Sequence, residues 1–226
     1  MNTRMARSLL LLASLACMQT VLSASPAGAW QPLVDDHAAP AWRGWVEEGL
    51  PKGWHVAGGV LSKEGSVDDL VSVREYASFE LEWQWKIGTA GNSGVLYRGT
   101  RAYDHIYWSA PEYQLLDDAN APDGKNRLTS TAADYALYAA PAGIVHAAGH
   151  WNRSRIVIDG NHVEHWLNGR KVVSYELGSE DWAAHVAASK FKEYPGYGKA
   201  ASGLIAIQGD HAGSLSLRGV RIRELH

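Results

Sequence analysis

The chain has 226 residues, 46% of them hydrophobic, and a formal net charge of −3, which is enough chain for one domain with a substantial core. Its basic residues form no stripe, so we do not expect nucleic acid as a partner. The aromatic set contains 10 Trp and 10 Tyr but only 2 Phe. Such a set suits β-strands, and it also suits stacking surfaces whose tips donate hydrogen bonds.

The N-terminus has the pattern of an export signal. Arg4 and Arg7 precede an apolar run over residues 9–16, which is too short to span a membrane as a mature helix. Ala27-Gly28-Ala29 then offers a small-x-small cleavage site. We therefore predict a signal peptide over residues 1–29 and a periplasmic or extracellular location.

The mature chain is expected to begin at Trp30. Without Arg4 and Arg7 it has 19 basic against 24 acidic residues, a net charge of −5, and no cysteine for a disulfide or a thiol nucleophile. Lipid anchoring at Cys17 is the less favoured alternative, because Ser14 stands where a lipoprotein site usually has Leu.

The first half of the mature chain is strand-rich. Residues 30–73 predict an opening strand, a turn-rich arm, a hairpin around Gly58-Gly59 and a short strand over 69–73. Phe79–Ile87 then alternates apolar and polar residues without a break, which predicts a half-buried antiparallel strand. Two polar-aromatic strands follow, over Asn92–Arg98 and Pro111–Asp118.

The second half begins with an irregular segment over residues 119–149. A loop of this length is often functional, and its Tyr135 and Tyr138 predict the rim of a site. Tight Asp-Gly and Asn-Gly turns then join three strands, and Ser179 is expected to cap a short helix near Ser179–Ala188. A final strand pair closes the chain, so we predict one all-β domain over residues 30–226, a two-sheet antiparallel sandwich with one short helix. The later strands are expected over Trp151–Ile158, Val163–Leu167, Lys171–Tyr175, Gly203–Gln208 and Ser214–Arg223.

Acid–base chemistry has several candidates. An exposed carboxylate on a strand is usually only part of a solvated face. Asp210-His211 follows a predicted strand, and a His beside a carboxylate can act as a base, although a turn His capped by its neighbour is the alternative. The candidate carboxylates are Glu82, Glu112, Asp117, Asp118 and Asp210.

His146 and His150 are the candidate metal ligands of the chain. A spacing of four residues brings two imidazoles together only on a helix, and here Gly143 and Gly149 flank the pair. We therefore predict no cofactor, and a divalent metal, though possible in principle, is not supported by the spacing.

Six motifs occur along the chain: Gly91-Asn92-Ser93-Gly94-Val95-Leu96-Tyr97-Arg98, Pro111-Glu112-Tyr113-Gln114-Leu115-Leu116-Asp117, Trp151-Asn152, Glu164-His165-Trp166-Leu167-Asn168-Gly169, Ser189-Lys190-Phe191 and Gly203-Leu204-Ile205-Ala206-Ile207-Gln208. Together they resemble the 3-keto-disaccharide hydrolase family, over about Leu33 to Ile222. The implied fold is a concanavalin-like jelly roll, and the implied activity is exported cleavage of oxidised glycosides. Two departures from the family pattern stand out: Gly209 lies between Gln208 and Asp210, and the segment 131–141 is rich in Ala.

The chemistry implied by this resemblance needs a base, an enolate stabiliser and an acid. A ketone at C3 acidifies the proton on C2, and loss of that proton allows the C1 substituent to leave by elimination, after which water adds back. We predict His211 as the base, or as its support, with Glu112 or Asp210 as partner. If Gly209 turns His211 away, Glu112 takes the role of base.

The substrate-binding residues are expected to converge on one concave sheet face with Glu112. Arg98 and the amides would hold hydroxyl groups and polarise the C3 carbonyl, and Trp166 would lie nearby. The predicted set is Glu82, Asn92, Tyr97, Arg98, Gln114 and Trp166.

Two other functional classes are alternatives. A non-catalytic carbohydrate-binding module on the same fold would need aromatic platforms but no base, since a fold alone does not determine function. A laminarinase-type glucanase would need the carboxylate spacing Glu-x-Asp-x-x-Glu, which the chain lacks. The expected partner is an oxidised, 3-keto glycoside, and we predict no membrane span.

Overall fold

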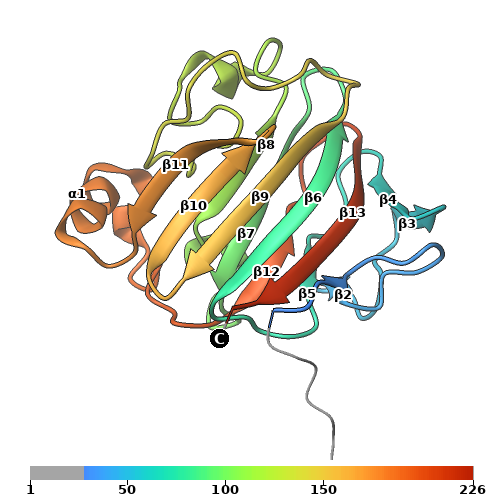
Figure 1. Cartoon of the computed structure of the whole chain (residues 1–226), viewed down its shortest axis with the longest axis horizontal. Coiled ribbons are helices and arrows are strands. Elements are labelled where there is room, and N and C mark those ends of the chain that lie inside the picture. The colour runs from blue at the N-terminus through green and yellow to red at the C-terminus, as the bar shows by residue number, and fades with distance from the viewer. Residues whose placement is uncertain (1–27, 226) are drawn as a thin grey trace, which may run out of the picture.

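Two antiparallel sheets packed face to face form the body of the structure, a computed structural model that describes residues 28–225 (Figure 1). The predicted two-sheet sandwich with one short helix is confirmed. Residues 1–27 of the signal peptide predicted over 1–29, Cys17 among them, lie outside the described residues. Among residues 28–225, no helix combines the length and the hydropathy needed to cross a membrane.

The larger sheet faces the viewer in Figure 1 and has eight strands. All its neighbours pair antiparallel, and the short β1 (Gln31–Pro32) pairs with β13. The order of the other strands is β11 (Arg170–Glu176), β10 (His162–Leu167), β9 (Asn152–Asp159), β6 (Phe79–Ile87), β13 (Leu215–Glu224), β4 (Val60–Lys63) and β3 (Trp54–Ala57).

The smaller sheet lies behind the larger one and has five strands (Figure 1). It carries the cavity described below. Its strand order is β2 (Trp42–Gly44), β5 (Leu70–Ser72), β12 (Leu204–Ile207), β7 (Asn92–Gly99) and β8 (Glu112–Leu116).

The predicted tight hairpins are present. Asn168 and Gly169 join β10 to β11 with φ of 48° and 82°, and Gly58 and Gly59 join β3 to β4 with φ of 56° and 72°. A two-residue turn with positive φ at both positions follows the twist of the strands, and Gly or Asn tolerates that conformation.

The core lies between the sheets and follows from the alternation in β6. Phe79, Leu81, Trp83, Trp85 and Ile87 are each at most 4% exposed, as the pattern predicted. They pack against the inward side chains of the smaller sheet, for example in the edge-to-face contact of Trp83 with Tyr113, whose ring centroids are 5.2 Å apart. Burial of these side chains contributes to the hydrophobic stabilisation of the sandwich.

The helix α1 (Glu180–Ala188) lies beside β11 at one edge of the sandwich (Figure 1). Ser179 is its N-cap, as predicted, and its side chain accepts a hydrogen bond from the backbone N–H of Trp182. Three single turns of 3-10 helix were not predicted: η1 (Ile106–Trp108), η2 (Pro122–Lys125) and η3 (Lys190–Glu193).

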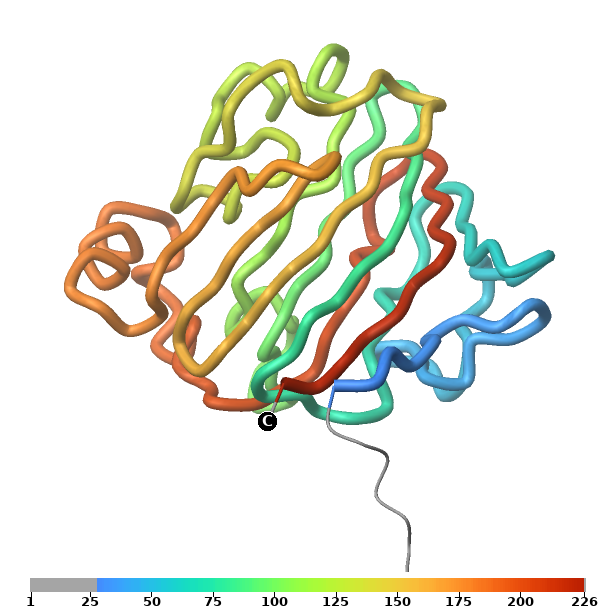
Figure 2. The backbone as a smooth tube through the Cα atoms, viewed as in Figure 1, coloured from blue at the N-terminus to red at the C-terminus, as the bar shows by residue number. Residues whose placement is uncertain are grey.

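Figure 2 shows that the final strand, β13, does not lie at an edge of its sheet. It runs between β6 and β4, and residues 31–32 of β1 also pair with it. The first and last strands of the described chain are therefore neighbours.

Candidate functional site

A cavity of about 350 Å³ opens on the outer face of the five-stranded sheet. Because side chains alternate along a strand, Asn92 of β7 points outward while Val95 and Tyr97 of the same strand point into the core. Asn92, Glu112, Gln114 and Gln208, from β7, β8 and the end of β12, line the cavity.

Gly94 leaves the space that Glu112 occupies. It lies opposite Gln114 in the β7–β8 pair, and a Cβ atom on it would lie 1.9 Å from Glu112 Oε1. Any side chain at this position would displace the carboxyl group. The glycine of the Asn92-Ser93-Gly94 motif therefore has a direct role in shaping the cavity.

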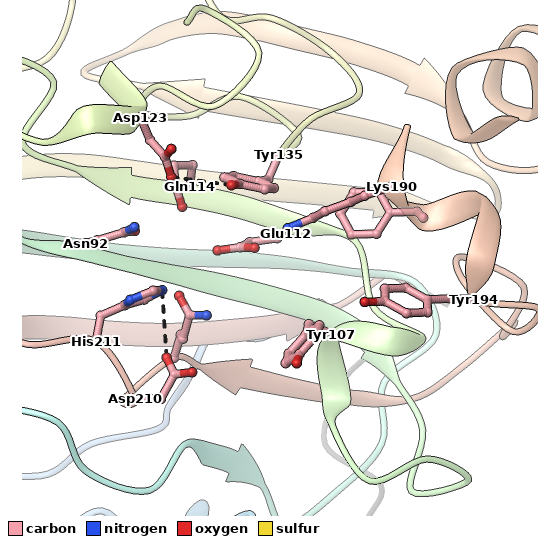
Figure 3. Close-up of a pocket in the computed structure, with 12 residues that line it drawn as sticks. Asn92, Tyr107, Glu112, Gln114, Asp123, Tyr135, Lys190, Tyr194, Asp210 and His211 are labelled. Carbon is pink, nitrogen blue, oxygen red and sulfur yellow. Dashed lines mark hydrogen bonds and ion pairs between the residues drawn. The ribbon is translucent and has the colours of Figure 1, made fainter. Parts of the chain in front are cut away.

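The rim comes from four separate segments of the chain. Tyr107 belongs to η1, Asp123 to η2 and Tyr135 to the long loop, while Lys190 and Phe191 come from η3 with Tyr194 directly after it. Asp210 and His211 complete the lining from the loop after β12. Figure 3 shows Lys190 reaching across toward Glu112.

Glu112 has the most unusual environment in the cavity. Only 8% of the residue is exposed, and burial raises the pKa of its carboxyl group to about 8, although the Lys190 ammonium acts in the opposite direction. The carboxyl group therefore keeps its proton at neutral pH and can donate it.

Asp210 and His211 form an ion-pair contact at the other end of the cavity (Figure 3). His211 Nε2 lies 3.8 Å from Asp210 Oδ1, and 44% of the His211 side chain is exposed. The imidazole is therefore accessible to a molecule in the cavity, and a carboxylate lies beside it.

The cavity floor presents hydrogen-bond acceptors that the protein itself leaves free. Within residues 28–225, Asn92 Oδ1, Gln114 Oε1 and Gln208 Oε1 are buried and have no hydrogen-bond partner. Gln114 Nε2 donates to the Thr129 carbonyl at 3.2 Å, which orients its amide oxygen. A buried acceptor without a partner is costly, so this floor suits a ligand that brings several hydroxyl donors.

Of the predicted site residues, the structure brings together Glu112, Asp210, His211, Asn92 and Gln114, and Tyr135 of the predicted rim joins them. Tyr138 does not, because its hydroxyl donates to Asp181 outside the cavity. The predicted convergence is wrong for the remaining four residues: Glu82, Tyr97, Arg98 and Trp166.

Glu82 and Trp166 belong to the other sheet. Glu82 Oε2 accepts hydrogen bonds from Arg153 at 2.9 Å and Arg221 at 2.7 Å on the outer face of the eight-stranded sheet. Trp166 lies in a separate hollow on that face, beneath the guanidinium of Arg155 at 4.3 Å.

Tyr97 and Arg98 have structural environments. Tyr97 is fully buried, and its hydroxyl contacts His165 Nε2 at 3.0 Å and the hydroxyl of Tyr175. Arg98 has a φ of 53° and donates to the carbonyls of Ala77 and Gly160, so its side chain leaves the sheet face.

The other carboxylate candidates hold loops in place. Asp117 accepts hydrogen bonds from the backbone N–H groups of Ala90 and Ala119, and Asp118 accepts from Thr131. Neither lines the cavity.

The two histidines weighed as metal ligands lie elsewhere, and His146 Nδ1 is 2.9 Å from the Trp151 carbonyl. Across residues 28–225 there is no group of three or more His, Cys, Asp or Glu side chains placed to hold a metal ion.

Sequence reasoning missed four cavity residues that matter for its chemistry: Lys190, Tyr107, Tyr194 and Gln208. The Ser189-Lys190-Phe191 motif was part of the family resemblance. However, nothing in the local sequence indicates that Lys190, which follows the predicted helix, faces a distant sheet. Tyr107 and Tyr194 lie on irregular segments where no periodicity indicates a direction.

The fold and its cavity define the general class, a concanavalin-like jelly-roll protein with a polar cleft on one sheet. A solved endo-beta-1,3(4)-glucanase superposes with a TM-score of 0.52 over 88% of this chain and 96% of its own, and at 10% identity this likeness concerns the fold alone. The chain belongs to the family described as the 3-keto-alpha-glucoside-1,2-lyase-like domain, which matches residues 29–223. The resemblance inferred from the sequence is thereby confirmed.

Three proteins are similar to the chain over most of its length. A 3-keto-disaccharide hydrolase of Bacteroides thetaiotaomicron is 29% identical over 225 aligned residues, covering 85% of this chain and 77% of the relative. A candidate glycosyl hydrolase from Parabacteroides distasonis, solved at 1.70 Å resolution, has a TM-score of 0.81 and 34% identity, covering 88% of this chain and 94% of its own. A second protein of that organism has a TM-score of 0.69 and 27% identity, covering 87% and 100%.

Proposed function

We propose that the protein cleaves the glycosidic bond of 3-keto-glycosides, with the cavity on the five-stranded sheet as its active site. Family membership and the names of the relatives support this proposal. The observation that carries it is Glu112, a buried carboxyl group with a pKa of about 8 on a floor of free acceptors. A group that is protonated at pH 7 and lies beside hydroxyl-binding amides suits acid catalysis on a sugar.

In the first step, His211 takes the proton from C2 of the sugar. The electron pair left on C2 delocalises into the C3 carbonyl and forms an enolate. Histidine is the side chain that most often serves as a general base in enzymes. We assign Lys190 to stabilise the enolate oxygen, since it is the cation that lines the cavity and Arg98 is directed elsewhere.

In the second step, the enolate re-forms the C3 carbonyl and a C1=C2 double bond, and the bond from C1 to the glycosidic oxygen breaks. That oxygen leaves with the proton of Glu112. Water then adds its oxygen to C1, C2 recovers a proton from His211, and Glu112 takes the proton released by water. The sum is hydrolysis; if the unsaturated sugar departs first, the reaction is that of a lyase.

The decisive experiment incubates the purified protein with 3-keto-trehalose and, separately, with unoxidised trehalose. We expect cleavage of the keto sugar alone. Folded His211→Ala and Glu112→Gln variants should each lose about 10²- to 10⁴-fold in rate. Glu82→Gln is the matched control, a carboxylate on the opposite sheet, and should retain full turnover.

Three outcomes would contradict parts of the proposal. Equal cleavage of trehalose would remove the requirement for the ketone. Full activity in folded His211→Ala protein would remove His211 from the mechanism. Binding of the keto sugar without any turnover would favour a carbohydrate-binding module instead.

We also propose that the chain is exported, on the pattern of residues 1–29. Mass spectrometry of the protein purified from its native cells should then give a mature N-terminus at Trp30. A lipid-modified chain beginning at Cys17 would instead indicate membrane anchoring, and an intact N-terminus would contradict export by this signal.

A further inference from the structure

The ammonium group of Lys63, at the end of β4, is buried beneath the loop that carries Asp210 and His211. The residue is 1% exposed, although lysine is almost never fully buried without partners. Lys63 Nζ donates to three carbonyl oxygens: Gly65 at 2.8 Å, His211 at 2.6 Å and Gly213 at 3.4 Å. Two of the three belong to the loop after β12.

This arrangement explains why a charged residue occupies the position. Burying an ammonium group is costly unless hydrogen bonds replace its water. The carbonyls of His211 and Gly213 are also polar groups that need donors when they are removed from water. Lys63 satisfies both requirements at once, so the position of its ammonium group and the path of the loop depend on each other.

The residues after Lys63 hold the same loop at further points. Ser66 Oγ donates to the Asp210 carbonyl at 2.5 Å, and the N–H of Gly65 donates to Gly213 O at 3.1 Å. Gly209 is held on both sides: its N–H donates to Asp69 Oδ1 at 2.7 Å, and its carbonyl accepts from Val67 N at 3.0 Å.

Gly209, which departs from the family pattern, is the residue that permits this close approach. A Cβ atom on Gly209 would lie 2.5 Å from the backbone oxygen of Asp68. Any other residue would push the loop away from the segment 63–69. The loop after β12 therefore packs against the segment 63–69.

We infer that Lys63 is a positioning residue for His211, acting through the backbone of the loop. The inference rests on the proposed role of His211 as the base. Lys63 does not line the cavity, so it would not contact the substrate. Its removal would let the loop move, and a misplacement of about 1 Å in a catalytic group can reduce the rate on the order of 10²-fold.

The test is a double-mutant cycle of Lys63→Met and His211→Ala, assayed with 3-keto-trehalose. In the otherwise unchanged protein we expect Lys63→Met to lower kcat about 10- to 100-fold with little change in KM. Lys63→Arg, which retains the charge and the donors, should recover part of the rate. In the His211→Ala background, Lys63→Met should cause no further loss.

An equal loss in both backgrounds would overturn the inference, because Lys63 would then act independently of His211. Full activity of Lys63→Met would also overturn it. If Lys63→Met does not fold, Ser66→Ala enters the same cycle, since Ser66 is exposed and the change removes one hydrogen bond to the loop. A loss of rate that occurs only when His211 is present supports positioning. A loss that is equal with and without His211, or no loss at all, overturns it.

Hydrogen exchange separates this inference from the proposed function. The amides of Gly65, Val67 and Gly209 should exchange faster in Lys63→Met than in the unchanged protein, whatever the activity. If His211→Ala is fully active while exchange is faster, the assignment of His211 has failed and Lys63 still holds the loop. If exchange is unchanged, the positioning itself has failed.

Discussion

Burial keeps the Glu112 carboxyl group out of water, while Asp69, Asp210 and Asp123 add negative charge around it, and both effects raise its pKa. The folded value of about 8 lies above the ordinary value of 4.5 that applies to the unfolded chain. The native state therefore holds an extra proton between these values, and stability falls as the pH rises across that window. Above about pH 8 the carboxyl group is ionised in both states, and the cost of burying the carboxylate lowers the free energy of unfolding by its full amount.

Glu112→Gln should therefore stabilise the protein while reducing its activity. The gain in the free energy of unfolding should be near zero at pH 4.5, grow toward pH 8 and level off at a few kcal/mol. Urea denaturation at pH 5, 7 and 9 measures it. If the gain in the free energy of unfolding does not change with pH, the pKa of Glu112 is the same in the folded and the unfolded protein, and this prediction is wrong.

Glu82→Gln is the control for this experiment because its linkage has the opposite sign. Burial acts to raise the pKa of Glu82, but hydrogen bonds from Arg221 and Arg153 lower it overall. Its charged form is therefore stabilising above the unfolded pKa, and that contribution is lost as the pH falls. Glu82→Gln should weaken the protein at pH 7 and matter less at low pH.

Arg98 is expected to affect stability and not substrate affinity. Arg98→Ala removes the donors to the carbonyls of Ala77 and Gly160, which should reduce the free energy of unfolding by about 1–3 kcal/mol. KM for 3-keto-trehalose should stay the same within about twofold. A large rise in KM in a folded Arg98→Ala protein would contradict this assignment.

Tyr97 and Arg98 show when alternation along a strand predicts the sheet face of a side chain and when it does not. Tyr97 is an odd number of positions from Asn92, so a regular strand puts the two on opposite faces, and this error was avoidable. Arg98 is an even number from Asn92, but its positive φ and the irregular register between β7 and β12 break the alternation. That departure depends on the paired strand and is not visible locally.

At the scale of elements, Ser189 joins two helices that meet beside the cavity. It is the C-cap of α1, its hydroxyl donates to the Val186 carbonyl at 2.9 Å, and it accepts from the N–H of Phe191 at 3.1 Å. The first turn of η3, which carries Lys190, is therefore oriented by this one side chain.

Ser189→Ala should consequently lower kcat by more than its loss of folding stability explains. Loss of a cap typically costs about 1 kcal/mol, and here it also frees the backbone next to Lys190. Ser179→Ala is the matched control, because it removes the cap at the other end of α1. Both variants should lose similar stability in urea, and only Ser189→Ala should lower kcat; equal kcat values would exclude this role for Ser189.

Strands and hairpins were predictable because their signals are local. Alternation in β6 and the Gly-rich turns specify a face and a reversal within a few residues. Residues 119–149 carry no such period, and their path is determined by pairing with β8, as in the hydrogen bond from Gln114 N to the Ala133 carbonyl. Contacts of this kind exist only after the sheet has formed.

For the whole molecule, the sandwich has two outer faces with different uses. The outer face of the five-stranded sheet holds the cavity, whereas the eight-stranded sheet carries a ladder of ion pairs such as Glu80 with Arg223 at 2.9 Å. The sequence predicted polar faces on β6, β7 and β8 alike. It could not show that β6 belongs to a different sheet, because strand order depends on contacts between distant segments.

The position of β13 has a consequence for biosynthesis. It is the final strand of the described chain, yet it lies between β6 and β4 and also pairs with β1. While a ribosome is still making residues 215–224, β6 and β4 each lack a partner along one edge, and an open sheet edge is neither stable nor protected. Until residues 215–224 are available to pair, the chain should therefore stay sensitive to protease, and its eight-stranded sheet should close only when β13 is added.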